Sequence, residues 1–235
     1  MSKNRWTPAA GPARSALGAA LAVLLLGLLA AALLARGLHE RNRQQASDRF
    51  QQLTTHVTGE LQQRLNVYEH GLRGARGAVI AAGGVHISRE RFDRYSASRE
   101  YKREFPGVRG FGYIRRVAPA DEAAFLQQAH SDGAPSLQIH QLTPHDGERF
   151  VILYIQPRRL NNPALGFDIA SEPARRAAAI AAARSGNPTI TAPIRLVQTP
   201  GVGNSGFLLL LPVYREDLPL QTPEQRWQAT TGWAY

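Results

Sequence analysis

The sequence predicts an α+β protein in which a membrane-spanning helix and a long stalk helix precede a domain built on antiparallel sheets. Three observations lead to this fold class. An unbroken apolar run covers residues 16–35, apolar residues then recur at helical spacing over 37–82, and short strand-like segments separated by turn residues fill the distal half. A single helix among several antiparallel strands is typical of α+β architecture.

The composition is that of a globular protein. The chain has 235 residues, a formal net charge of +10, 43% hydrophobic residues and no cysteine, which excludes disulfides and thiolate metal sites. The excess charge is mostly arginine between Arg36 and Arg116, which suits anionic lipid headgroups or nucleic acid, or simply solvated helix faces. Because no aromatic residues interleave with these arginines in a recognition pattern, we expect no nucleic-acid partner.

The first element is the apolar run, which reads ALGAALAVLLLGLLAAALLA and contains no charge. At about 1.5 Å per residue it spans roughly 30 Å, the thickness of a bilayer's hydrocarbon core. A cleaved signal peptide is the alternative, but its apolar region is usually only about 7–15 residues long, and no small-x-small cleavage pattern follows here. We therefore predict a tail over 1–15 and an uncleaved membrane anchor over 16–35. Basic residues flank both ends, so the charge rule leaves the orientation open.

The second element is a long helix over 37–82. Its apolar residues recur every three or four positions, with a mean spacing of about 3.7. They are Ala46, Phe50, Leu53, Val57, Leu61, Leu65, Tyr68, Leu72, Ala75 and Val79. A narrow stripe next to a membrane predicts a stalk paired with a second copy in a homodimer, whereas the second half of the helix could equally pack on its own domain. We expect the first part of this helix to form the stalk and the later part to pack on the domain.

The elements over 83–133 follow from their turn residues. Gly83-Gly84 ends the long helix, and Ser88 caps a charged helix over 89–104. A strand over 108–117 and a short helix over 119–130 come next.

The distal elements are mostly strands. Turn chemistry between 136–142 and 150–156 predicts a hairpin, and 165–170 reads as another strand. Ser171 is a suitable N-cap for a helix that Gly186 ends. Strands are expected over 189–197 and 206–214 and from Gly232, where the sequence stops within a strand; we interpret the chain as the front of a longer protein.

Three segments carry a resemblance to a known family. They read FPGVRGFGYIRRV (105–117), LGFDIASEPARRAAAIAAARSGNPTITAPIRLVQT (165–199) and GFLLLLPVYR (206–215). Their order and spacing resemble the CHASE domain, the extracytoplasmic sensor of bacterial receptors and plant cytokinin receptor kinases. The resemblance covers about half the chain.

The resemblance implies a sensor domain over 83–235 with two PAS-like modules. The membrane-proximal part would span about 83–133 and the ligand-binding part about 134–235. It also implies a cytoplasmic N-terminus, a periplasmic domain and a second membrane span. The output behind such sensors is typically a histidine kinase, a diguanylate cyclase, a phosphodiesterase or an adenylyl cyclase, and none of these modules occurs in this sequence.

Asp168 is the first candidate site residue. It ends an apolar segment, where a carboxylate is costly to bury without partners. The resemblance implies that it accepts hydrogen bonds from a purine-like base, as an ionised carboxylate can meet two N–H donors side by side. Alternatively, it caps the following helix or pairs with Arg175 or Arg176.

Three further candidates come from the resemblance. Ile190 and Thr199 match an aliphatic and a hydroxyl position of the plant pocket, and Thr191 could bond either a ligand or a backbone group. Core packing and strand-end capping are their alternative roles.

Nothing in the sequence predicts a catalytic site, a metal site or a cofactor. The seven histidines are scattered without a metal-ligand motif, and His145 lies in an expected turn, where we predict it to be solvent-exposed. We therefore predict a membrane-anchored periplasmic sensor that binds a small molecule and passes its occupancy through the stalk. A ligand-free structural domain and a periplasmic enzyme using Asp168 are the alternatives.

Overall fold

The computed structural model describes residues 12–197 and 205–235, and the chain divides into two compact units, Met1–Gln62 and Gln63–Tyr235. The described residues of the first unit form the N-terminal part of one helix, α1 (Pro12–Ala81). Within the described residues, this is the helix that is long and apolar enough to cross a membrane, and its membrane-length apolar window is fully exposed. The predicted N-terminal apolar helix is therefore confirmed.

The second unit contains the end of α1, six further α-helices, seven strands and four 3₁₀ helices among its described residues. The helices are α2 (Arg89–Ala97), α3 (Tyr101–Glu104), α4 (Glu122–Ser131), α5 (Arg158–Asn161), α6 (Pro173–Ser185) and α7 (Pro223–Ala229). The strands are β1 (Phe111–Val117), β2 (Arg149–Gln156), β3 (Thr189–Ile190), β4 (Ile194–Arg195), β5 (Ser205–Gly206), β6 (Leu209–Tyr214) and β7 (Thr230–Ala234). The 3₁₀ helices are η1 (Gly84–His86), η2 (Pro119–Asp121), η3 (Asn162–Ala164) and η4 (Ile169–Ser171).

Five strands form one antiparallel sheet in the order β2-β1-β7-β6-β3, and β4 and β5 form a separate two-stranded ribbon. Two glycines let the central strands approach closely. A Cβ at Gly112 would lie 2.0 Å from the carbonyl oxygen of Tyr154, and one at Gly232 would lie 2.0 Å from that of Ile114. The fold is therefore α+β with antiparallel sheets, as predicted.

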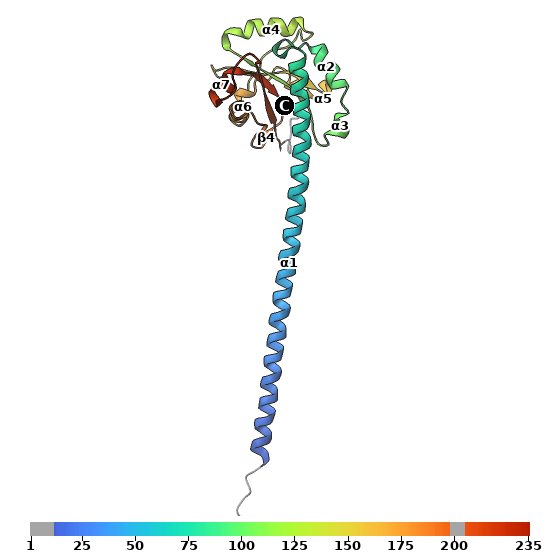
Figure 1. Cartoon of the computed structure of the whole chain (residues 1–235), viewed down its shortest axis with the longest axis vertical. Helices are drawn as coiled ribbons and strands as arrows, with labels where there is room; N and C mark the ends of the chain where they lie inside the picture. The colour runs from blue at the N-terminus through green and yellow to red at the C-terminus, as the bar shows by residue number, and fades with distance from the viewer. Residues whose placement is uncertain (1–11, 198–204) are drawn as a thin grey trace, which may run out of the picture. The chain divides into compact units, whose positions relative to one another are not determined.

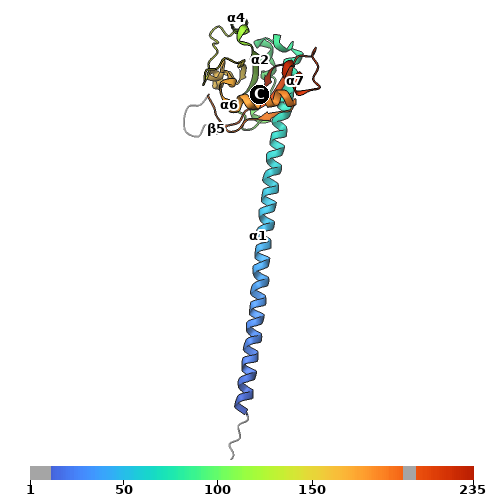
Figure 2. The ribbon, with the colours of Figure 1, turned by 90° about the vertical axis from the view of Figure 1, so that its left-hand side faces the viewer.

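Both faces of the sheet are covered. One face carries Phe150, Ile152 and Trp233 against the alanines of α6, and the other carries Tyr113 and Val151 against α2, α4 and the end of α1. In Figure 1, α6 and α7 lie on one side of the sheet of this unit and α2 lies on the other; the first two face the viewer in Figure 2. Covering on both sides explains why β2 is apolar at nearly every position.

The helix α1 changes character along its length. Leu61 is 58% exposed, whereas Leu72 and Ala75 are buried against Leu211 and Ala234 of the sheet. The expected change from an exposed stripe to domain packing is confirmed.

Several element predictions are wrong. The segment 136–142 makes a single isolated bridge, from His140 to Phe167, and β2 pairs with β1 instead of forming the expected hairpin. The segment 165–170 forms a turn, two isolated bridges at Phe167 and Asp168 and the first two residues of η4 rather than a strand. Its backbone hydrogen bonds are divided between Ile152 of β2, His140 and neighbouring turns, so no continuous ladder forms.

Two other predicted elements are interrupted, and one N-cap is assigned to the wrong residue. The predicted helix over 89–104 breaks into α2 and α3, and the predicted strand over 189–197 survives only as the short β3 and β4. The N-cap of α6 is Glu172 and not Ser171, since the Glu172 carboxylate accepts hydrogen bonds from the backbone N–H groups of Ala174 and Arg175.

Candidate functional site

Asp168 lies at the centre of a buried polar cluster. Its side chain has no exposed surface, and its two oxygens accept four hydrogen bonds. Oδ1 accepts from the backbone N–H groups of Phe150 (2.8 Å) and Ala170 (3.0 Å). Oδ2 accepts from Gln141 Nε2 (2.9 Å) and His145 Nε2 (2.8 Å). Four donors match the acceptor capacity of a carboxylate, so the cost of burying it is met.

The backbone around Asp168 explains how the cluster forms. Asp168 is the N-cap of η4, and its N–H donates to the carbonyl oxygen of His140 (2.9 Å). Ser171 Oγ donates to the Asp168 carbonyl (2.6 Å) and accepts from the N–H of Leu142 (3.0 Å). Asp168 and Ser171 thereby fasten the segment 140–145 to η4 and to the start of β2.

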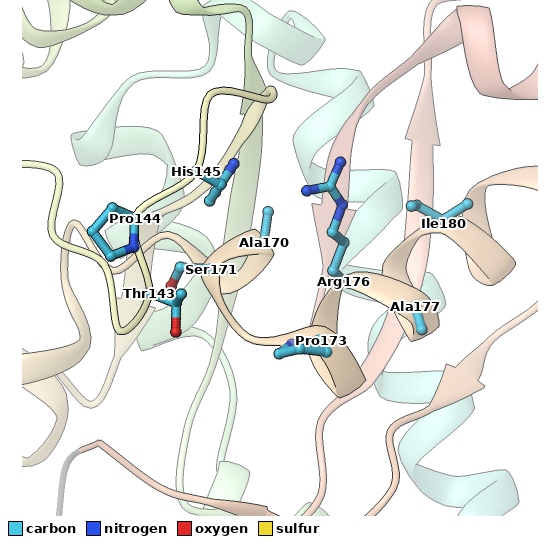
Figure 3. Close-up of a pocket in the computed structure, with 9 residues that line it drawn as sticks. All are labelled: Thr143, Pro144, His145, Ala170, Ser171, Pro173, Arg176, Ala177 and Ile180. Carbon is cyan, nitrogen blue, oxygen red and sulfur yellow. The ribbon is translucent and has the colours of Figure 1, made fainter.

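A surface pocket of about 440 Å³ lies beside this cluster. Its walls are the loop over 143–145, η4 and the first turns of α6. The lining residues are Thr143, Pro144, His145, Ala170, Ser171, Pro173, Arg176, Ala177 and Ile180. Figure 3 shows the Arg176 side chain extending from α6 toward the loop that carries His145.

His145 connects the pocket to the carboxylate. Its ring is 16% exposed and lines the pocket, while its Nε2 bonds to Asp168 Oδ2. When Nε2 carries the proton in the neutral ring, Nδ1 is an acceptor, and Arg149 Nη1 lies 3.4 Å from it. Arg149 also donates to the carbonyl oxygens of His145 (2.5 Å) and Gly147 (2.7 Å), which holds the loop in shape.

The two arginines at the start of α6 differ in environment. Arg175 is buried, stacks over the Phe167 ring at 4.8 Å and donates to the Arg195 carbonyl oxygen at 2.6 Å. Burial lowers the pKa of its guanidinium, and the nearby Glu172 carboxylate opposes that shift. Arg176 is half-buried, and its guanidinium makes no hydrogen bond or ion pair to any residue that the structure describes.

None of the three predicted site residues that the structure describes, Asp168, Ile190 and Thr191, lines this pocket. Asp168 reaches it only through His145, and neither Arg175 nor Arg176 pairs with that carboxylate within the described chain. Asp168 does cap the turn that follows it, although that turn is η4 and not α6.

The other three predicted residues have separate surroundings. Ile190 is 47% exposed on β3. Thr191 is buried, and it exchanges two hydrogen bonds with Leu208, through its N–H and its Oγ1. Thr199 lies outside the described residues. A ligand-binding role for these residues remains a prediction.

The prediction that His145 is solvent-exposed is wrong, whereas its neighbour Asp146 is exposed. Gln141, His145 and Arg176 were not among the predicted site residues. No local signal identifies them, because the Asp168 partners Gln141 and His145 lie 27 and 23 residues away in the sequence.

The comparison with protein families decides the membership. A family model of the CHASE domain matches residues 85–235, which is more than half of the chain. This chain belongs to the CHASE domain family. A comparison with curated proteins finds no match.

Membership gives the general role of the chain. CHASE domains are extracytoplasmic, small-molecule-sensing domains of signal-transduction receptors, and they are not catalytic. The extracytoplasmic location agrees with the apolar N-terminal helix, which is able to span a membrane.

Proposed function

We propose that the chain is the membrane-anchored, periplasmic sensor module of an inner-membrane receptor and that its ligand binds in the pocket beside Asp168. The observation that carries the proposal is the position of His145, which lines a pocket of about 440 Å³ and bonds to Asp168 at 2.8 Å. Through its other contacts, Asp168 holds the start of β2 and η4 together. A ligand that moves His145 therefore acts on a junction between two elements.

The output module would lie outside this chain, as a histidine kinase or a cyclic-di-GMP enzyme such as a diguanylate cyclase. We propose that the signal reaches it through α1 in a homodimer. Phe50, Leu53, Val57 and Leu61 are spaced by three or four residues and are 58–70% exposed. Such an apolar stripe on an otherwise polar helix favours pairing with a second copy.

We propose the division of the chain that the sequence predicts: a tail over 1–15, a membrane anchor over 16–35, a stalk over 37–82 and a sensor domain over 83–235. The two PAS-like modules, about 83–133 and 134–235, would share a sheet, because β1 pairs with both β2 and β7.

A purine-like ligand is the candidate that the family resemblance implies. To meet Asp168 Oδ2, its N–H donors would replace those of Gln141 and His145, which now occupy that oxygen. Ile190 and Thr191 would contact the same ligand only after a rearrangement, since neither lines the pocket. Thr199, which lies outside the described residues, is proposed as a further contact.

The test is a thermal-shift screen of metabolites, purines included, on the full chain in detergent. Ala177 lines the pocket from the exposed side of α6, so Ala177→Trp fills the pocket without entering the core. Ala181→Trp is the matched control, because Ala181 is also exposed on α6 and does not line the pocket.

We expect compounds that raise the melting temperature of the parent to lose that effect in Ala177→Trp and to keep it in Ala181→Trp. A ligand shift that survives Ala177→Trp would place binding elsewhere. A screen without any shift would favour a ligand-free structural domain, and turnover of a compound would favour an enzyme.

A further inference from the structure

We propose that the pocket beside Asp168 takes a small organic carboxylate, whose anionic group meets Arg176 and whose apolar part packs against α6. The inference rests on the proposed function, since it names the class of ligand for that same pocket. Three features of the lining carry it: a cation without a partner among the described residues, acidic groups that already have partners, and an apolar wall.

The cation is the guanidinium of Arg176. It lies at the pocket, half-buried, and within the described part of the chain it has neither a hydrogen-bond acceptor nor an ion-pair partner. Its Nη2 would be 3.3 Å from a Cβ built on Gly147, and His145 Nδ1 would be 3.4 Å from that same point. Two nitrogen groups therefore flank Gly147 at one end of the pocket. A guanidinium presents a planar set of donors that fits a carboxylate in a bidentate manner.

The acidic groups around the pocket do not neutralise Arg176. The Asp168 carboxylate is saturated by four donors, and that of Glu172 accepts from two backbone N–H groups of α6. Glu122 pairs with Arg149 and Glu148 pairs with Arg116. Asp146 is exposed, and no ion pair joins it to Arg176 in the described structure.

The rest of the lining is mostly apolar. Pro144, Ala170, Pro173, Ala177 and Ile180 supply carbon surface, and the polar groups of Thr143 and Ser171 lie beside it. A volume of about 440 Å³ is within the range of roughly 300–1,000 Å³ that is usual for small-molecule sites. An apolar site with one cationic group favours a complementary ligand, with one anionic end and a hydrophobic body.

The position of His145 gives binding a consequence. A carboxylate at Arg176 would lie beside the loop that carries His145, whose ring bonds to Asp168. Ligand occupancy would then stabilise one placement of this loop relative to η4 and β2, which is the differential contact that a sensor needs.

The experiment compares matched acids and amides on the full chain in detergent. The pairs are acetate and acetamide, butyrate and butyramide, benzoate and benzamide, phenylacetate and phenylacetamide, and indole-3-acetate and indole-3-acetamide; adenine is added as a neutral heterocycle. The amides keep the shape of the acids and lack the charge. Dissociation constants come from titrations of the melting temperature.

The variants are Arg176→Gln and, as a matched control on the same helix, Arg184→Gln, whose side chain is 52% exposed and outside the pocket. We expect at least one acid to bind about tenfold or more tightly than its amide, and Arg176→Gln to remove this difference while Arg184→Gln keeps it. Arg176→Lys retains the charge and should keep most of the preference for the acid. It is used in place of Arg176→Gln if the glutamine variant has a much lower melting temperature than the parent.

The inference is overturned if no acid binds more tightly than its amide, or if the preference for the acid is unchanged in Arg176→Gln. If adenine binds in an Arg176-independent manner and Ala177→Trp abolishes its binding, the carboxylate inference fails while the proposed sensor site stands. If an acid binds to Ala177→Trp and to Arg176→Gln as tightly as to the parent, both the carboxylate inference and the proposed sensor site fail.

Discussion

At the residue scale, Asp168 shows how one side chain organises a site. Its four donors come from positions 2, 18, 23 and 27 residues away in the sequence. The carboxylate therefore joins η4, the start of β2 and the loop over 141–145. Because every acceptor site is used, any ligand contact with Asp168 would have to be exchanged for an existing one. In the proposed site a ligand would meet His145 and not Asp168, since His145 lines the pocket and Asp168 does not.

The first prediction concerns this cluster. Asp168→Asn keeps the shape of the side chain but turns one acceptor oxygen into an NH₂ group that faces the donors of Gln141 and His145. We expect the free energy of unfolding to fall by about 1–3 kcal/mol, the usual cost of leaving buried polar groups unpaired. Asp146→Asn, in the exposed part of the same loop, should change it by less than about 0.5 kcal/mol.

The measurement is urea unfolding of the full chain in detergent, followed by tryptophan fluorescence. Equal stabilities of Asp168→Asn and Asp146→Asn would contradict the structural role of the buried carboxylate.

Only part of this site was predictable from sequence. The burial cost of Asp168 and its capping of the next turn are local properties, and the sequence indicated both. Gln141 and His145 reach Asp168 through loop closure across more than 20 residues, and the turn-forming residues around His145 indicate solvent exposure instead. Arg176 stands out only once its lack of a partner in the described structure is known.

At the element scale, local patterns identified elements better than their pairing. The nearly continuous apolar run over 150–156 predicted a strand, and β2 confirms it; the burial of its six central residues shows that both faces are covered. The turn chemistry after 142 suggested a hairpin, but the loop is held by Asp168 and Arg149, and β2 pairs with β1. Strand partners are chosen by packing between distant segments, which turn residues do not encode.

The second prediction concerns the stripe on α1. The chain has no cysteine, so a single introduced cysteine reports on pairing without background. Leu53→Cys lies within the exposed apolar stripe, and Thr55→Cys lies on roughly the opposite side of the helix, since two residues advance it by about 200°. We expect oxidation in membranes to give a disulfide-linked dimer with Leu53→Cys and little with Thr55→Cys.

The readout is the dimer band on a non-reducing gel. Equal cross-linking at both positions would indicate random collision, and its absence at both would contradict a paired stalk.

At the scale of the whole molecule, the pocket and the C-terminal end of α1 lie against the same sheet in the second unit. The pocket lies at α6 and η4, which pack on one face, and Leu72, Ala75 and Val79 of α1 pack on the other face. Under the proposed function, two layers that share a sheet would give a physical route by which a shift at the loop over 143–145 changes the packing of α1.

The sheet also buries several tyrosines. Burial raises the pKa of Tyr113, Tyr154 and Tyr235, and it raises the pKa of Tyr214 to about 12. The Tyr235 hydroxyl is buried and has no hydrogen-bond partner among the described residues. With only two lysines in the chain, Lys3 and Lys102, tyrosines dominate its titration between about pH 10 and pH 12.

These tyrosines predict how the stability of the chain depends on alkaline pH. Above about pH 10 the unfolded chain loses phenolic protons that the folded chain retains, so the unfolded state binds fewer protons and the free energy of unfolding falls as pH rises. Each buried tyrosine contributes a slope of about 1.4 kcal/mol per pH unit until its folded-state pKa is reached. Tyr235→Phe removes one such group, and with it a hydroxyl that has no hydrogen-bond partner in the described structure. We therefore expect this variant to be at least as stable as the parent at pH 7 and to lose stability less steeply above pH 10, measured by urea unfolding at a series of pH values. Parallel curves for the two proteins would show that Tyr235 ionises equally in both states and is not buried as described.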